Sequence, residues 1–167
     1  MHILEFLKEE LCLDCKIGED NRGRGCYSLE FSDEQIFNDL NKFGIIPQKT
    51  YKSNHLKYDL IPEEYLPAYV LGLLDGDGSI VVSKDCSTDV SINFTTYFES
   101  TAKDCQELID SLIGKTEHTK LFFTTAWHCQ WRGRIQVLKI LDLLYNNCPI
   151  FLNRKKEIYL RLKDSLK

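Results

Sequence analysis

The sequence lacks the long apolar segments that would place a protein in or across a membrane. Its 167 residues contain no run of 18 or more apolar residues, the length that a transmembrane helix needs. The first residues also lack the basic and apolar regions of a secretory signal peptide. Apolar residues make up 43% of the chain, an ordinary share for a globular protein. We expect one domain or two small ones, in the cytoplasm, an organelle or the nucleoid.

Common catalytic and metal-binding motifs are missing as well. The chain has no P-loop, no G-x-G-x-x-G segment and no nucleophile-elbow serine, which argues against nucleotide-binding and serine-hydrolase classes. The four histidines do not have the spacing of a zinc-protease motif. The seven cysteines are scattered, and Cys12 and Cys15 form a C-x-x-C pair without a second pair. Reduced thiols are therefore favoured over zinc ligands.

An excess of positive charge is also absent. The formal net charge is -4, which does not favour a nucleic-acid partner. The distribution is uneven, because residues 1–64 hold 8 basic and 13 acidic side chains, whereas residues 148–167 hold 6 basic and 2 acidic ones. Any DNA-binding surface is therefore local and belongs to the second half of the chain.

The most informative segment is residues 65–80, which predicts a short apolar helix that ends on two carboxylates and two glycines. Gly72 interrupts its large residues, and glycine inside a helix costs about 1 kcal/mol relative to alanine. We interpret that cost as a sign that another backbone approaches closely. Asp75 and Asp77 stand at the C-terminal end, where the helix dipole disfavours negative charge. Two such carboxylates without a cation nearby in sequence indicate a divalent metal.

The run Leu71-Gly72-Leu73-Leu74-Asp75-Gly76-Asp77-Gly78 resembles the signature helix of the LAGLIDADG homing endonucleases. The resemblance implies an α+β fold: a LAGLIDADG-type αββαββα unit with an antiparallel sheet covered on one face by helices. It also implies that Asp77 binds Mg²⁺ or another divalent cation, with the Gly76 carbonyl as a secondary ligand and Asp75 as support for the helix end. Taken alone, the D-G-D-G segment also fits a turn in which aspartate oxygens bond to local amides.

A basic residue near the start of the last helix commonly acts at the scissile phosphate in this family. In this chain the last helix starts at Asn153-Arg154-Lys155-Lys156. The resemblance places Asn153, which has no charge, where the family has that basic residue, with Arg154 and Lys155 beside it. We therefore interpret Lys155 as the catalytic cation. An equally open interpretation is a basic helix start that contacts only the DNA backbone.

The spacing of apolar residues predicts the order helix–strand–strand–helix at residues 2–43 and again at about 100–145. Only the second set is preceded by a signature helix and two further strands. We therefore predict that residues 1–60 form a partial N-terminal repeat and a connector, and that residues 61–167 form the LAGLIDADG domain.

Polar side chains alternate with apolar ones on the predicted strands. Family members lay such a sheet in the major groove, where amides, hydroxyls and arginines suit base edges and cations suit phosphates. A solvated sheet face without a partner explains the same alternation. The residues that we assign to double-stranded DNA are Ser83, Lys84, Ser91, Asn93, Thr95, Lys120, His128, Gln130, Arg132, Arg134, Asn153 and Arg154.

The chain carries one signature helix, whereas two such helices pack about a twofold axis in the family. We therefore expect a homodimer in which Gly72 and Leu71 lie at the helix interface. A monomer, by this reasoning, would leave Val70, Leu71 and Leu74 partly exposed.

The leading hypothesis is a sequence-specific, metal-dependent endonuclease of the homing type that cuts double-stranded DNA. A second hypothesis is a DNA-binding regulator or maturase-like protein on the same scaffold that does not cut. The net negative charge, the missing first signature helix and Asn153 favour it. A third, a module for partners other than DNA, rests on the acidity alone.

Overall fold

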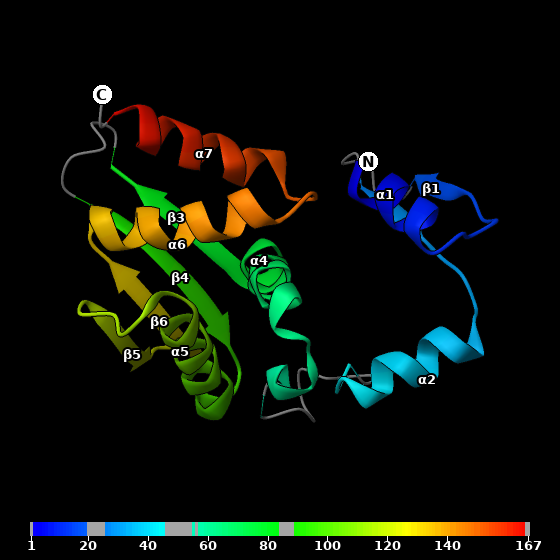
Figure 1. Cartoon of the computed structure of the whole chain (residues 1–167), viewed down its shortest axis with the longest axis horizontal. Coiled ribbons are helices and arrows are strands. Elements are labelled where there is room, and N and C mark those ends of the chain that lie inside the picture. Colours follow the sequence, from blue (N-terminus) through cyan, green and yellow to red (C-terminus); the bar gives the residue numbers. More distant parts are fainter. Residues whose placement is uncertain (1, 20–25, 46–54, 56, 84–88, 166–167) are drawn as a thin grey trace. The chain divides into compact units, whose positions relative to one another are not determined.

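The computed structural model describes residues 2–19, 26–45, 55, 57–83 and 89–165 (Figure 1). The chain divides into two compact units, Met1–Leu40 and Asn41–Lys167. None of the described helices is long and apolar enough to cross a membrane.

The first unit consists of short elements with little buried surface. Helix α1 (His2–Glu10) precedes the antiparallel strands β1 (Ile17–Glu19) and β2 (Tyr27–Leu29), and helix α2 (Glu34–Lys42) follows them. This is the helix–strand–strand–helix order that the apolar spacing predicts. Neither helix contains a buried residue, as expected for a segment of about 40 residues, which is at the lower limit for an independent core.

The second unit contains the signature helix and a four-stranded sheet. Its order from α4 to α6 is αββαββα, which confirms the predicted α+β class. Its elements are η1 (Tyr58–Leu60), η2 (Glu63–Tyr65), α4 (Leu66–Asp77), β3 (Gly78–Val82), β4 (Val90–Thr96), α5 (Glu99–Ile113), β5 (Thr119–Phe123), β6 (Trp127–Arg132), α6 (Arg134–Asn147) and α7 (Asn153–Asp164).

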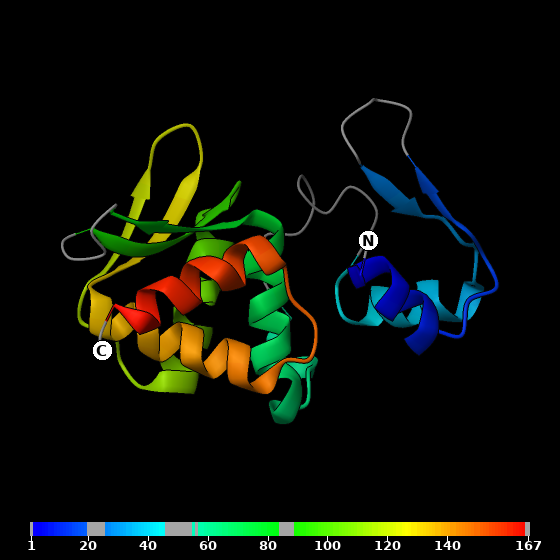
Figure 2. The ribbon, with the colours of Figure 1, turned by 90° about the horizontal axis from the view of Figure 1, so that it is seen from above.

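The sheet has the strand order β3-β4-β6-β5, and each neighbouring pair is antiparallel. Within the second unit, the helices lie on one side of this sheet and leave its other face open (Figure 2). Because side chains alternate between the two faces of a strand, one face of each strand must be apolar and the other can be polar. The open face is defined by the register Ser79↔Asn93↔Gln130↔Lys120.

The face of the sheet toward the helices is apolar and forms the core. Strands β3, β4 and β6 bury Ile80, Ile92, Phe94, Cys129 and Trp131, and helices α4, α5 and α6 all contact the sheet. The helices complete the core with Val70, Leu71, Leu74, Leu108, Ile109, Ile140, Leu141 and Leu144.

Gly78 allows helix α4 to become strand β3 without a loop. Its N–H donates to the Leu74 carbonyl, and its backbone is already extended. A Cβ atom at this position would lie 2.7 Å from the Leu74 carbonyl oxygen and 2.8 Å from its Cα. Only glycine therefore fits the turn that brings the end of α4 to the edge of the sheet.

The expectation that a lone signature helix leaves its apolar residues exposed is wrong. Val70 and Leu71 are 2% exposed and Leu74 is 4% exposed. They are covered within their own chain, because α4 packs against α5, α6 and the sheet. Leu71 thus faces the core rather than outward, whereas Gly72 is exposed and has no atom within 4 Å of an added Cβ.

We expect Leu71→Ala to lower the free energy of unfolding by about 2–5 kcal/mol, because it removes a buried side chain and leaves a cavity. Urea unfolding measures the change. Leu160→Ala is the matched control, since Leu160 on α7 is 46% exposed and such surface changes stay within about 0.5 kcal/mol. Equal costs for the two substitutions would contradict the packing of α4.

Candidate active site and nucleic-acid interface

The last turn of α4 carries the two carboxylates of the signature segment in different surroundings. Asp77 ends the helix and is exposed. Asp75 is half-buried, and its Oδ2 accepts a hydrogen bond of 2.8 Å from the backbone N–H of Leu152, the residue before α7. One carboxylate is therefore tied to the chain, and the other faces solvent.

The ammonium of Lys155 lies beneath the end of α4. Lys155 is 2% exposed, and its Nζ donates to the carbonyl oxygens of Leu74, Asp75 (3.1 Å) and Gly78 (2.7 Å). An ammonium has three donors, so the backbone occupies all of them. The end of a helix leaves carbonyls without intrahelical partners, and a cation there complements the dipole. Lys155 thus closes the C-terminal end of α4.

The surroundings of Lys155 also affect how it titrates. Burial lowers the pKa of its ammonium, and the negative charge of Asp75 offsets part of that shift. Burial raises the pKa of the nearby Tyr145 hydroxyl, and Asp75 raises it further. Among the described residues, neither this hydroxyl nor Oδ1 of Asp75 has a hydrogen-bond partner. The end of α4 therefore lies next to a polar cluster formed by Asp75, Tyr145 and Lys155.

The described residues of one chain do not form a complete metal site. Among the described residues, no group of three or more His, Cys, Asp or Glu side chains is arranged to hold a metal ion. Mg²⁺ is usually held by one or two carboxylates, together with waters and phosphate oxygens. The exposed carboxylate of Asp77 and the adjacent Gly76 carbonyl fit that mode when a second carboxylate or a phosphate completes the site.

The open face of the sheet carries most of the side chains assigned to DNA. Gln130 Nε2 donates to Asn93 Oδ1 at 2.6 Å, and Asn93 Nδ2 donates to the Ser91 hydroxyl at 3.4 Å. Arg132 at the end of β6 forms an ion pair of 3.2 Å with Asp89. The face is thus polar and cross-linked between strands.

His128 occupies a fixed position on the same face. Its Nδ1 lies 3.2 Å from the Thr95 hydroxyl, and its Nε2 lies 2.8 Å from the Thr124 hydroxyl. The Phe122 ring stacks on the imidazole, with a centroid distance of 4.8 Å and an interplanar angle of 14°. Phe122 is 37% exposed. The open face therefore presents an apolar ring, Phe122, stacked on a histidine that is held by two hydroxyl groups.

Several residues assigned to DNA lie elsewhere or are covered. Lys84 lies outside the described residues, and Ser83 follows β3, where its N–H donates to the Asp89 carbonyl. Ser91 has the register of the open face but is only 7% exposed. The remaining three belong to helices: Arg134 starts α6, where its Nη2 donates to the Ser165 hydroxyl at 2.5 Å, and the exposed Asn153 and Arg154 start α7.

The sequence reasoning named Gly72 on α4 but missed that it belongs to a stripe of small residues. Ala68, Gly72 and Gly76 are all exposed and follow one another at intervals of four residues. Positions four apart share one face of a helix. An added Cβ at Gly72 or Gly76 meets no atom within 4 Å. The spacing of small residues in the sequence, taken with the polar end at Asp77, would have revealed this face.

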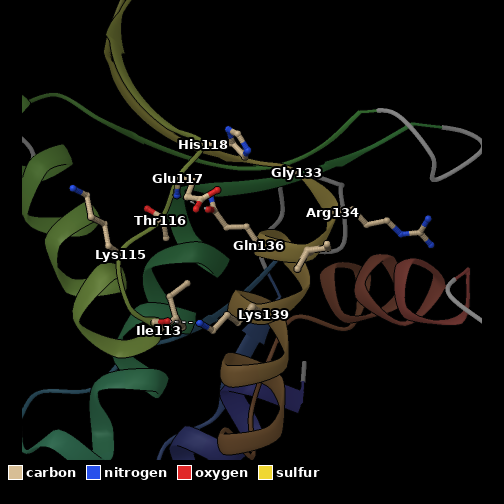
Figure 3. Close-up of a pocket in the computed structure, with 10 residues that line it drawn as sticks. Ile113, Lys115, Thr116, Glu117, His118, Gly133, Arg134, Gln136 and Lys139 are labelled. Atoms are coloured by element: carbon tan, nitrogen blue, oxygen red, sulfur yellow. Dashed lines mark hydrogen bonds between the residues drawn. The ribbon is translucent and has the colours of Figure 1, made fainter.

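A hollow of about 510 Å³ lies where β5 and α6 begin (Figure 3). Lys115 and Arg134 line it but point away from one another, and Lys139 Nζ donates to the Ile113 carbonyl. Gly133 N–H donates to the Val90 carbonyl, and Val90 pairs with Val82, at the far end of β3 from Gly78. The hollow is therefore remote from Asp77 along the strands and gathers no convergent set of charges.

Comparisons with known proteins complete these observations. Residues 64–144 match the family model described as a LAGLIDADG-like domain. This match spans α4, all four strands of the large sheet and most of α6. Curated proteins give no match. Among solved structures, the crystal structure of a homing endonuclease, I-TnaI, is similar with a TM-score of 0.42 and 13% sequence identity, over 59% of this chain and 69% of that chain.

We expect Lys155→Met to lower the free energy of unfolding by about 1–3 kcal/mol, because three backbone carbonyls around the end of α4 lose the ammonium that donates to them. Chemical denaturation measures the loss. The adjacent Lys156→Met is the matched control: Lys156 Nζ lies 3.7 Å from the centroid of the Phe151 ring, and such a contact contributes about 0.5–1 kcal/mol. A Lys155 variant as stable as the wild type would contradict the capping role.

Proposed function

We propose that this chain, whose residues 64–144 match the model of a LAGLIDADG-like domain, is a sequence-specific endonuclease that hydrolyses phosphodiesters of double-stranded DNA with a divalent metal ion. The position of Asp77 carries the proposal. This exposed carboxylate stands directly before β3, the edge strand of the sheet whose other face is open and polar. A duplex on that face would lie beside the carboxylate. Such an enzyme works where its DNA lies, in the cytoplasm, the nucleoid or an organelle.

Asp77 and the carbonyl of Gly76 would hold the metal, with Mg²⁺ as the first choice for hard oxygen ligands. When bound, such an ion lowers the pKa of a coordinated water and stabilises a leaving oxygen. The rest of the chain keeps Asp77 in place, through Asp75, which binds the Leu152 N–H, and Lys155, which binds three carbonyls. We therefore propose a positioning role for Lys155 in place of the phosphate contact expected from the sequence.

A homodimer would supply the second carboxylate. The stripe formed by Ala68, Gly72 and Gly76 lets two helices approach closely, because no side chain separates their backbones. A twofold axis along this stripe would place the C-terminal ends of two α4 helices, and hence two Asp77 carboxylates, beside each other. The core of each subunit is complete without the partner, since Val70, Leu71 and Leu74 are already buried.

DNA binding would use local positive charge on an acidic protein. Lys120 on β5, Arg132 on β6 and Arg154 on α7 are exposed, and each can neutralise a phosphate. The amides and hydroxyls of the open face would contact base edges. Because few cations are involved, we expect a shallow dependence of affinity on salt compared with strongly basic DNA-binding proteins.

A DNA-binding protein that does not cut is the second candidate. It is favoured by the incomplete set of metal ligands among the described residues and by the occupied donors of Lys155. Both candidates share the open sheet face, and cleavage assays separate them.

We expect Asp77→Asn to abolish Mg²⁺-dependent cleavage while DNA binding is retained, because the amide removes a metal-binding charge without adding bulk. The assay selects bound DNA from a random-site library and then incubates it with Mg²⁺. The matched control is Glu157→Gln, an exposed acidic residue on α7, which should cut like the wild type. Tight binding without cutting by the wild type, with any divalent metal, would support the second candidate.

We expect Gly72→Leu to turn a dimer into a monomer without loss of monomer stability. A Cβ added at Gly72 has no packing neighbour within 4 Å, and leucine is a better helix former than glycine by about 0.8 kcal/mol. Sedimentation equilibrium measures the mass. Lys103→Leu, at an exposed position on α5, controls for added surface hydrophobicity and should remain dimeric. A wild-type protein that is monomeric at micromolar concentration would refute the dimer.

A further inference from the structure

The centre of the open sheet face holds one row of residues that crosses all four strands. The register joins Ser79 to Asn93, Asn93 to Gln130, and Gln130 to Lys120. The two middle members are amides, and both are half-buried. Side chains of directly opposed residues lie about 4.5–5.5 Å apart at Cβ, which is close enough for one amide to orient the next.

The hydrogen bonds that involve the two amides run in one direction. Gln130 Nε2 donates to Asn93 Oδ1 at 2.6 Å, and Asn93 Nδ2 donates to the Ser91 hydroxyl at 3.4 Å. The bond from Asn93 Nδ2 to a hydroxyl leaves the carbonyl oxygen of Asn93 directed at Gln130. Asn93 Oδ1 therefore takes one N–H of Gln130 within the sheet, and the carbonyl oxygen and the second N–H of Gln130 are left over.

The remaining atoms of Gln130 form one acceptor and one donor. Glutamine has a carbonyl oxygen and two N–H donors, of which one donor is taken by Asn93. In the major groove, adenine presents the N6 donor beside the N7 acceptor, whereas guanine presents two acceptors. An acceptor–donor pair thus complements adenine and fits guanine poorly. The fixed amide carries this discrimination.

We propose that Gln130 reads an adenine in the major groove of the target DNA, and that Asn93 is the positioning residue that sets the orientation of its amide. This inference rests on the proposed DNA-binding function and names a base at one position of the target. In a homodimer the same contact recurs in each half of a palindromic site. Lys120, the neighbour of Gln130 in the row, faces the same groove and has the chemistry of a phosphate contact.

The test is enrichment of a random double-stranded DNA library by the full chain without Mg²⁺, followed by sequencing of the bound fraction. For the wild type we expect one adenine-enriched position in each half-site, with discrimination of about 5- to 150-fold against other bases. Gln130→Ala should lose the preference at that position alone. Gln130→Glu should shift it from adenine toward cytosine, because a carboxylate offers only acceptors and cytosine N4 is a donor.

Two further variants test the role assigned to Asn93. Asn93→Asp keeps an acceptor for Gln130 Nε2 and should retain the adenine preference, although the added charge lowers affinity for every sequence. Asn93→Leu removes that acceptor and should weaken the preference at the Gln130 position. Lys120→Ala is the control, and it should weaken binding to all sequences without changing any base preference.

The outcomes separate this inference from the proposed function. If the wild type enriches no sequence, both the DNA-binding function and the base contact are overturned. If the wild type enriches a site and Gln130→Ala and Gln130→Glu give the same preference at every position, the DNA-binding function stands and the adenine contact is overturned. A folded state for each variant is checked by its thermal unfolding midpoint, and a variant of unchanged fold and changed single-base preference supports the contact.

Discussion

The bond between the Lys155 ammonium and the end of α4 is the interaction on which the site depends. The carbonyls of Leu74 and Asp75 in the last turn of the helix, and that of Gly78 at the start of β3, converge on one cation. With Gly78, which lets the helix enter the sheet without a loop, this bond determines where α4 stops. Asp77 is the last residue of that helix. The position of Asp77 therefore depends on the packing of α7, which carries Lys155.

Because side chains alternate along each strand, the sheet has one apolar face that forms the core and one polar face that is open. One face buries Ile92, Phe94 and Trp131 against the helices, and the other joins Asn93 to Gln130 and Thr95 to His128. Each polar pair links neighbouring strands at the same level. A polar face that is cross-linked in this way loses little side-chain entropy when a partner binds. The rigidity of the face would favour discrimination between bases more than general affinity.

The outer surface of α4 shows why a complete subunit core and a dimer are compatible. The large residues of the helix turn inward, and Ala68, Gly72 and Gly76 remain outside. A surface of small residues needs no partner for folding, because it exposes little apolar area. It nevertheless allows a second backbone to come near. Stability and the proposed association would therefore depend on opposite faces of one helix, and substitutions can separate them.

The sequence alone determined the class of fold and the signature segment. Apolar periodicity predicted helices and strands, because one face of every strand and helix must be buried. The resemblance of residues 71–78 to the signature helix implied the αββαββα order, and the D-G-D-G run marked the end of α4. The tertiary structure decided which residues far apart in the sequence are in contact, which the periodicity does not show. Lys155 is 77 residues from Gly78 in the sequence, and its Nζ donates a hydrogen bond to the Gly78 carbonyl. The basic start of the last helix therefore indicated a cation, but the sequence could not identify its acceptors. Leu71 and Gly72 are neighbours in the chain, and only the packing of α5 and α6 showed that one faces the core and the other solvent.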